Sequence, residues 1–439
     1  MPRLNPPPAV LEIAARLERA GFEAWCVGGA IRDALLGHPH LDWDLATSAT
    51  PDQLRELFGL KRTVPVGIVF GTVGVLDRTG AMHEVTTFRR DVHTDGRHAQ
   101  VEFGVSLEDD LARRDFTINA IAYSAARDEL RDPFGGRKDL ERRLVRAVGD
   151  ADTRMREDRL RALRAIRFAA RFGFAIDEAT RSAIDASAPF LGRLSAERVK
   201  QELDKTMEQV RRPGSALEIW QRAGAFRTLI PRLADAEESA LRAPDFAAMP
   251  GPRNRPARRV IRFAAMLATL PAADAAGVMT DLRGSKHEIQ TVENLVDRWQ
   301  RLGRDMEAIM RSSVPTDVQI RRWVAAIGRL RIGAFMRLAI AMWCADDRES
   351  AAARAARRAY RRMLRSAFVD AVDIGSLAVD GDDLRRSGIP PGPGLGKILQ
   401  ILLDAVIEDP ARNTTDWLLQ EAKRLRADAV SGSGVVDAE

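Results

Sequence analysis

Residue types that bind phosphate and metal come together in one short stretch near the N-terminus, CVGGAIRDALLGHPHLDWDLATSAT. Gly28 and Gly29 allow a backbone to approach a phosphate closely, and Arg32 adds a forked donor for phosphate oxygens. Asp42 and Asp44 flank one tryptophan, and in a strand such residues point to the same face. Two carboxylates on one face suit Mg²⁺, whose remaining ligands are often substrate phosphates. On its own the stretch is interpreted as a site for a metal-bound nucleoside triphosphate or as an ordinary polar loop, and the polar loop is slightly favoured.

A second motif, EDRLRALRAIRF at 157–168, has the spacing of an amphipathic helix. Beside its leucine and isoleucine stripe runs a polar stripe with a residue at every third position. Its members are Asp158, Arg161, Arg164 and Arg167. A stripe of this kind is usually a solvated, salt-bridged face. Three arginines with only one acid among them are harder to explain as a salt-bridged face.

An aspartate and an arginine presented together can distinguish nucleobases. A carboxylate only accepts hydrogen bonds, and a guanidinium only donates them. Cytosine and adenine both present an amino donor beside a ring-nitrogen acceptor, whereas uracil and guanine present a carbonyl beside an N–H. One Asp–Arg pair can therefore accept C and A and reject U and G without a nucleic-acid template.

The elements that must position these side chains follow from local patterns. Strands alternate with helices through the first ~125 residues, which is typical of an α/β layer. The patterns predict a helix over 9–20, strands in EAWCVGG and LDWDLAT, a helix capped by Thr50, and a hairpin of FGTVGVL and MHEVTTF. After DPFGG at 132–136 the spacing is helical almost to the end of the chain.

The length of 439 residues predicts two to four domains. We expect a small α/β head followed by a long all-helical region, which is an α+β protein. Breaks between helices are predicted at RRPGS, at 243–259 and at GIPPGPGLG. The expected parts are a head (9–136), a neck carrying the arginine-rich helix (137–230), a body (231–369), a tail (370–430) and a flexible end (431–439).

Composition narrows the possible partners and location. The net charge is +6, and residues 137–171 hold 12 Lys/Arg against 6 Asp/Glu, so the excess lies beside the arginine motif. This favours a polyanionic partner. Cys26 and Cys344 are far apart, and no hydrophobic signal core or membrane-spanning run is present. We therefore expect a cytoplasmic protein that does not bind a membrane.

These motifs, in this order, resemble the class II tRNA nucleotidyltransferase and poly(A) polymerase family of the polymerase-β-like superfamily. Besides the two motifs above, the resemblance rests on FRRDVHTDGRHAQVEFGVSLEDDLARRDFTINAIA, DPFGGRKDL and LSAERVKQELDKTM. They correspond to a flexible loop with a ribose-contacting motif, a hinge, and a helix that packs behind the base-reading site. The resemblance covers about residues 22–210. It implies a polymerase-β-like nucleotidyltransferase head followed by an elongated all-helical neck, body and tail.

The resemblance also implies a role for each candidate residue. It implies catalytic, metal-binding carboxylates at Asp42 and Asp44; triphosphate contacts at Gly28, Gly29 and Arg32; a nucleotide contact at Arg114 with ribose-side neighbours Asp115 and Asn119; a base template at Asp158 and Arg161; and further nucleotide contacts at Arg164 and Arg167. Glu84 is either an auxiliary carboxylate or an edge-strand charge, and we favour the edge-strand interpretation.

The implied reaction is Mg²⁺-dependent addition of CCA to the 3′ end of tRNA from CTP and ATP, with release of pyrophosphate. LKRTVPVGIVFGTVGVL resembles CCA-adding members more than poly(A) polymerases, although Phe70 stands where histidine is usual. A full flexible loop at 88–105, with Asp95, Gly96 and Arg97, favours addition of A as well as C.

Alternative functions are an A-only enzyme, a poly(A) polymerase, a hydrolase or small-molecule nucleotidyltransferase, and a non-catalytic RNA-binding protein on a degenerate head. Residues 352–368 hold six arginines and no acid. This segment is interpreted equally well as a contact to the tRNA backbone or as a solvated basic face.

Overall fold

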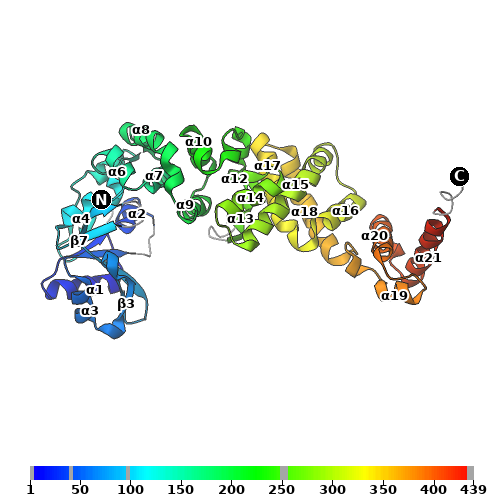
Figure 1. Cartoon of the computed structure of the whole chain (residues 1–439), viewed down its shortest axis with the longest axis horizontal. Coiled ribbons are helices and arrows are strands. Elements are labelled where there is room, and N and C mark those ends of the chain that lie inside the picture. The colour runs from blue at the N-terminus through cyan, green and yellow to red at the C-terminus, as the bar shows by residue number, and fades with distance from the viewer. Residues whose placement is uncertain (1–3, 39–42, 95–98, 248–255, 433–439) are drawn as a thin grey trace. The chain divides into compact units, whose positions relative to one another are not determined.

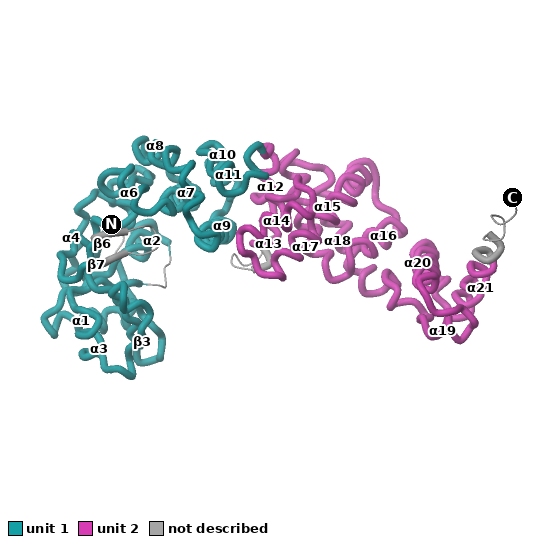
Figure 2. The backbone as a smooth tube through the Cα atoms, viewed as in Figure 1, with its two compact units in different colours: residues 1–235 teal, residues 236–439 magenta. Residues whose placement is uncertain are grey.

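The computed structural model describes residues 4–38, 43–94, 99–247 and 256–432 (Figure 1). The chain divides into two compact units, Met1–Asp235 and Ala236–Glu439 (Figure 2). Strands are concentrated in the first ~130 residues, and helices make up nearly all of the remainder. The predicted α+β class, a small mixed head followed by many helices, is confirmed.

The head is built on a mixed seven-stranded sheet with the order β3-β4-β5-β2-β1-β8-β9. Its strands are β1 (Ala24–Val27), β2 (Asp44–Thr47), β3 (Thr63–Gly67), β4 (Thr72–Leu76), β5 (Met82–Thr87), β8 (Ala122–Ser124) and β9 (Glu129–Arg131). β2 pairs antiparallel with β1 and parallel with β5. A separate hairpin joins β6 (Arg89–Thr94) to β7 (Ala99–Phe103).

The two faces of the sheet have different coverings. The helices α1 (Pro8–Arg19) and α3 (Pro51–Phe58) pack against the sheet (Figure 1). A second core joins Trp25 and Ala46 of the sheet to Leu111 on α4 (Leu107–Ala112). Asp44 is two residues before Ala46 in β2, so it points toward this second layer.

Most local predictions for the head are confirmed. The helix over 9–20 is α1, the strand in EAWCVGG is β1, and the predicted hairpin is the antiparallel pair of β4 and β5. Thr50 caps α3 in a reciprocal capping box with Gln53. The strand predicted over LDWDLAT begins only at Asp44. Trp43, just before it, is buried.

Helices occupy the rest of the first unit, apart from one small parallel pair of strands. The helices are α2 (Gly29–Leu35), α5 (Gly136–Glu141), α6 (Ala151–Glu157), α7 (Leu160–Phe172), α8 (Glu178–Ser187), α9 (Ala196–Gln209), α10 (Gly214–Arg222) and α11 (Ala225–Leu229). β10 (Leu144–Val145) pairs with β11 (Ala175–Ile176) across α6 and α7. This pair is an addition to the region that was expected to be entirely helical.

Helices alone form the described part of the second unit. They are α12 (Glu238–Phe246), α13 (Pro256–Leu267), α14 (Ala272–Asp281), α15 (Lys286–Ser312), α16 (Asp317–Ile327), α17 (Ile332–Asp346), α18 (Ala351–Val369), α19 (Gly381–Arg386), α20 (Pro393–Glu408) and α21 (Thr415–Gly432). Each predicted break contains a junction between helices, but helices extend into all three: α10 begins at Gly214, α20 begins at Pro393, and α12 and α13 extend into 243–259. Among the described helices, none combines the length and apolarity of a membrane span.

Candidate active site

One cavity in the first unit has a volume of about 510 Å³. It is lined by residues of both sequence motifs, the glycine–aspartate stretch near the N-terminus and the arginine-rich stretch at 157–168. The candidate residues from the sequence that line it are Gly28, Gly29, Arg32, Asp44, Arg114, Asp115, Asn119, Asp158, Arg161, Arg164 and Arg167. This volume lies within the range of small-molecule sites. The phosphate-binding and base-reading candidates therefore face the same space, as a single nucleotide requires.

Three predicted features cannot be placed in this cavity. Asp42 and the loop residues Asp95, Gly96 and Arg97 lie outside the described residues. Glu84 is described and exposed, but it does not line the cavity.

The edge-strand interpretation of Glu84 is wrong, because β5 lies inside the sheet between β4 and β2. Its neighbour Val85 is paired with Leu45 of β2. Glu84 and Asp44 are each one residue earlier on these parallel strands, so they share one face of the sheet.

Glycine is required at position 28 by both conformation and space. Gly28 has a φ of 77°, in the left-handed region that side chains disfavour. A Cβ built there would lie 3.1 Å from Nη1 of Arg114. The backbone at the start of α2 therefore closely approaches a cationic side chain of the cavity.

Arg32 is buried in an aromatic and acidic setting. Its Nε donates to Oδ1 of Asp33 at 2.8 Å. Its guanidinium lies 5.0 Å from the ring centre of Phe168 and 4.8 Å from that of Phe172. Burial lowers the pKa of Arg32, and Asp33 opposes that shift. On the other side, Asp33 accepts from Nη2 of Arg171 at 3.1 Å, which ties α2 to α7.

A buried carboxylate fixes the two arginines that precede the ribose-side residues. Oδ1 of Asp110 accepts from Arg113, with Nη2 at 2.8 Å, and its Oδ2 accepts from Nη2 of Arg114 at 3.2 Å. These two charges keep the pKa of Asp110 below its usual value despite burial, which acts to raise it. Arg114 is thereby held at the cavity wall, and Arg113 lines the same cavity.

Asp115 and Arg164 form a second fixed pair. Nε of Arg164 donates to Oδ2 of Asp115 at 2.8 Å, and Nδ2 of Asn119 donates to Oδ1 at 2.9 Å. Burial acts to raise the pKa of Asp115, but Arg164 and Asn119 outweigh it and the pKa is lowered. For Arg164 burial acts to lower the pKa, and Asp115 with Glu202 raises it overall. Both groups are therefore charged.

The helix predicted over 157–168 is wrong at its first residues. α6 ends at Glu157, and α7 begins at Leu160. Asp158 lies between them with extended backbone, and its Oδ1 accepts from the N–H of Leu160 at 3.0 Å. Aspartate favours such local bonds over a helix interior. The carboxylate consequently sits at the start of α7 and not within its stripe.

Asp158 and Arg161 are held by different partners. Oδ2 of Asp158 accepts from Nη2 of Arg198 at 2.8 Å. Nη1 of Arg161 donates to Glu157 at 2.6 Å and to the carbonyl of Arg154, while its Nη2 donates to the carbonyl of Arg113 at 3.1 Å. A guanidinium has five N–H donors, and these bonds use three of them. Both groups keep hydrogen-bonding capacity while their positions are fixed.

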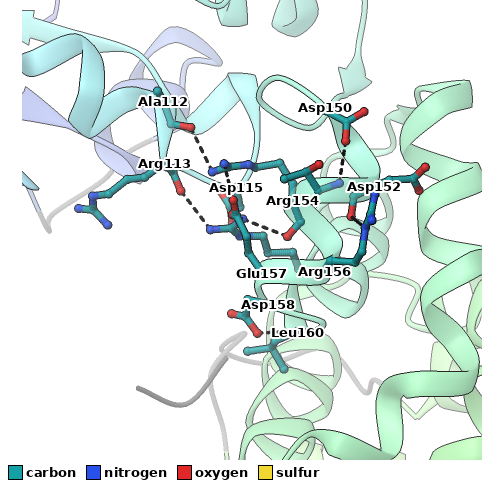
Figure 3. Close-up of polar contacts among 12 residues, drawn as sticks. Ala112, Arg113, Asp115, Asp150, Asp152, Arg154, Arg156, Glu157, Asp158 and Leu160 are labelled. Carbon is teal, nitrogen blue, oxygen red and sulfur yellow. Dashed lines mark hydrogen bonds and ion pairs between the residues drawn. The ribbon is translucent and has the colours of Figure 1, made fainter. Parts of the chain in front are cut away.

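Glu157 forms the centre of this support. It accepts from Arg154 and from Arg161, each at 2.6 Å. Arg154 also donates to the carbonyl of Ala112 at 3.3 Å. Figure 3 shows Glu157 and Arg154 beside the end of α4, with Asp158 beyond them. The segment that carries Asp158 and Arg161 is thus attached to the loop that carries Asp115 and Asn119.

The helix α9 runs alongside α7 and supports it at three levels. Arg198 binds Asp158, the buried Glu202 binds Arg167 at 2.7 Å, and Gln209 accepts from Arg171 at 3.4 Å. The paired residues are 35 to 40 positions apart in the sequence. Asp158, Arg167 and Arg171 therefore each have a partner on α9, whereas the partners of Arg161 are Arg113, Arg154 and Glu157.

Sequence reasoning missed several residues of the site. They are Arg113, Glu157, Phe168, Arg171, Arg198, Glu202, Lys205 and Gln209. A longer reading of the arginine stripe would have reached Arg171, one turn beyond Arg167. The spacing of four and seven residues from Arg198 through Glu202 to Gln209 was a second available signal. The resemblance implied that LSAERVKQELDKTM packs behind the base-reading site, but it assigned no role to the polar residues of that helix.

The donor chemistry fits a divalent metal at the glycine end of the cavity. Asp44 provides carboxylate oxygens, which hard divalent cations prefer, and Glu84 lies on the same sheet face. Within the described ranges no cluster of three His, Cys, Asp or Glu could hold a metal alone. A site of this kind relies on few protein carboxylates and on substrate phosphates, as Mg²⁺ sites do.

Two family models match parts of the chain. The poly(A) polymerase head domain matches residues 24–146, and a probable RNA- and SrmB-binding site of polymerase A matches residues 173–237. Over nearly the full length, the chain is 35% identical to the CCA-adding enzyme of Latilactobacillus sakei, covering 94% of this chain and 97% of that one. The chain belongs to the CCA-adding enzyme family.

Other members of the CCA-adding enzyme family agree with this placement. The Geobacillus thermodenitrificans enzyme is 48% identical over 45% of this chain and 48% of its own length. The Bacillus stearothermophilus enzyme, solved in complex with CTP, superimposes with a TM-score of 0.76 at 29% identity, covering 96% and 98% of the two chains. CCA-adding enzymes are metal-dependent nucleotidyltransferases. The suspected family and enzyme class are thus confirmed.

Proposed function

We propose that this enzyme adds C, C and A in turn to the 3′ end of tRNA, using CTP and ATP. The observation that carries the proposal is the single cavity shared by Asp44, Arg32 and the Asp158–Arg161 segment. A nucleotide whose phosphates lie at the glycine end would present its base to the other end. The relative from Bacillus stearothermophilus was solved with CTP, which supports a nucleotide in this place.

In the proposed reaction, the 3′-hydroxyl oxygen of the RNA bonds to the α-phosphorus of the nucleotide, and pyrophosphate leaves. Mg²⁺, held by Asp44 together with Asp42 and Glu84, would neutralise the charge on the phosphates. Gly28, Gly29 and Arg32 bind and orient the triphosphate. No side-chain nucleophile is needed, because catalysis consists of positioning and charge neutralisation.

Base selection is assigned to two fixed side chains. Asp158 accepts from the amino group that C and A share, and Arg161 donates to their ring nitrogen. Arg114, Asp115 and Asn119 are assigned to the ribose side. The remaining nucleotide contacts are assigned to Arg164 and Arg167, although Arg167 is largely committed to Glu202. We place the enzyme in the cytoplasm, in keeping with two free thiols.

An extension assay tests this proposal. The protein is incubated with Mg²⁺, labelled CTP or ATP, and tRNA that ends at the discriminator base, at C or at CC. We expect addition of CCA followed by arrest. An unlimited A tail would indicate a poly(A) polymerase, extension of the CC end alone would indicate an A-only enzyme, and no incorporation would indicate a non-catalytic protein.

A further inference from the structure

The helix α18 separates into a buried face and an arginine face. Its buried residues include Ala352, Ala356, Ala359, Met363 and Ala367. Its exposed arginines are Arg354, Arg357, Arg358, Arg361 and Arg365. At about 100° per residue, these five fall within an arc of about 100° and extend along about 16 Å of helix. The helix therefore presents a narrow cationic row to solvent.

Few of these arginines are neutralised within the protein. Arg354 donates to the carbonyl of Glu349. In the part of the chain that the structure describes, Arg357, Arg358, Arg361 and Arg365 form no ion pair. A neighbouring arginine behaves differently, because Arg362 is paired with Asp317 at 2.6 Å. Like charges four residues apart destabilise a helix, and a solvated helix face usually mixes both signs.

An aromatic side chain continues the row. Phe368 falls within the same arc, three residues after Arg365, and is 81% exposed. Large apolar side chains are usually buried, so this position is unusual beside four unpaired charges. Positive charge that follows a backbone, together with an aromatic ring for base stacking, is the combination used to bind unpaired nucleic acid.

We propose that this arginine row, defined as Arg354, Arg357, Arg358, Arg361, Arg365 and Phe368, binds the phosphate backbone of the RNA substrate outside the catalytic cavity, with Phe368 stacking on an exposed base. The proposal rests on the proposed function, which supplies the RNA. An acidic protein surface would satisfy the charges but offers no base to the phenyl ring. Arginine contacts to phosphate do not depend on base sequence, so tRNAs of different sequence can share the row.

The test compares two triple variants of the full-length protein. Arg357→Gln/Arg361→Gln/Arg365→Gln removes three charges from the row, and glutamine has nearly the helix propensity of arginine. The control Arg301→Gln/Arg311→Gln/Arg424→Gln removes three exposed arginines that are already paired with acids. The affinity for tRNA is measured from 50 to 200 mM salt, and the affinity for CTP is measured separately.

For the row variant we expect tRNA affinity to fall at least tenfold at low salt and the logarithmic salt slope to shrink by about 2–3. CTP affinity should stay unchanged, and the control should retain the wild-type slope. In Phe368→Ala we expect about 5- to 100-fold weaker binding with an unchanged slope. If the triple variant of the arginine row keeps the wild-type tRNA affinity and salt slope, the proposal is overturned, and the row is only a solvated face of the helix. A wild-type protein that binds tRNA but adds no nucleotide refutes the proposed function and leaves this test intact.

Discussion

Two arginine-rich helices, α7 and α18, look alike in sequence but have different surroundings. Along α7 the arginines point into a cavity and meet acids from other elements, such as Asp115 and Glu202. Along α18 most of them face solvent, and within the described residues four have no acidic partner. A fixed, paired guanidinium can present its remaining donors at a set angle, whereas an unpaired one is a mobile charge. We infer that α7 recognises a nucleotide by geometry and that α18 binds RNA by charge.

The largest expected effect is a loss of catalysis on substitution of a residue in the cavity that α7 lines. Asp44→Ala removes the carboxylate that we propose binds the metal, and we expect incorporation of CTP and ATP to fall by ~10³-fold or more. Binding of tRNA should remain near the wild-type value, because α18 is unchanged. Rapid-quench incorporation and filter binding measure the two effects. Substantial residual incorporation would place the metal elsewhere.

The second prediction concerns the contribution of Glu202, the buried acid beside α7, to the stability of the protein. Glu202→Ala leaves the buried Arg167 without its counter-charge, so we expect the free energy of unfolding to fall by about 3–5 kcal/mol. On α18, Arg365→Ala should change it by less than about 0.5 kcal/mol. Urea unfolding followed by circular dichroism compares the two variants. Equal losses would show that the two helices do not differ in this respect.

The third prediction concerns base choice. Arg198 binds Asp158 from α9, so Arg198→Met should let the carboxylate move and lower the preference for CTP over UTP about tenfold. The measured quantity is the ratio of kcat/KM for the two nucleotides. Arg193→Met, an exposed position just before α9, is the control.

Arg198→Lys restores the charge without the forked geometry, so it should recover only part of the preference. If Arg198→Met lowers kcat for both nucleotides equally and keeps their ratio, the residue supports the fold and does not position the base reader.

The smallest expected effect is a pH dependence of stability. The pKa of Asp115 is lowered in the folded protein, mainly by Arg164 acting against burial. A lowered folded pKa contributes stability above the unfolded value of about 4, and this stability is lost as the pH falls through the folded pKa. We expect Asp115→Asn to weaken the acid-dependent loss of stability between pH 5 and pH 2. Unfolding midpoints that change equally in both proteins would contradict this.

The glycine end of the site was predictable from sequence because its parts are local. Gly28, Gly29, Arg32 and Asp44 lie within one short stretch, and their spacing in β1, α2 and β2 brings them together. The helices and strands of the head were also predictable from sequence, because the capping at Thr50 and the alternating pattern of β4 and β5 depend on only a few neighbouring residues. Interactions between residues close in the sequence therefore account for the glycine end of the site.

The base-reading end was less predictable because its geometry depends on distant partners. Asp158 was assigned to a helix from the three-residue spacing, but its own carboxylate binds the N–H of Leu160 and ends that pattern. Its ion-pair partner, Arg198, is 40 positions away on another helix. Similarly, no periodicity could show that Glu202 would pair with Arg167 of α7 while, among the described residues, four arginines of α18 would form no ion pair.

The ratio of kcat/KM for CTP to that for UTP, compared between wild type and Asp158→Asn, tests the central claim most directly. The claim is that one cavity binds the triphosphate beside Asp44 while Asp158 and Arg161 select the base. Asparagine can donate to the carbonyl of uracil, so we predict that the ratio falls by about 10- to 100-fold while CTP is still incorporated. An unchanged ratio would contradict the claim and place base selection elsewhere.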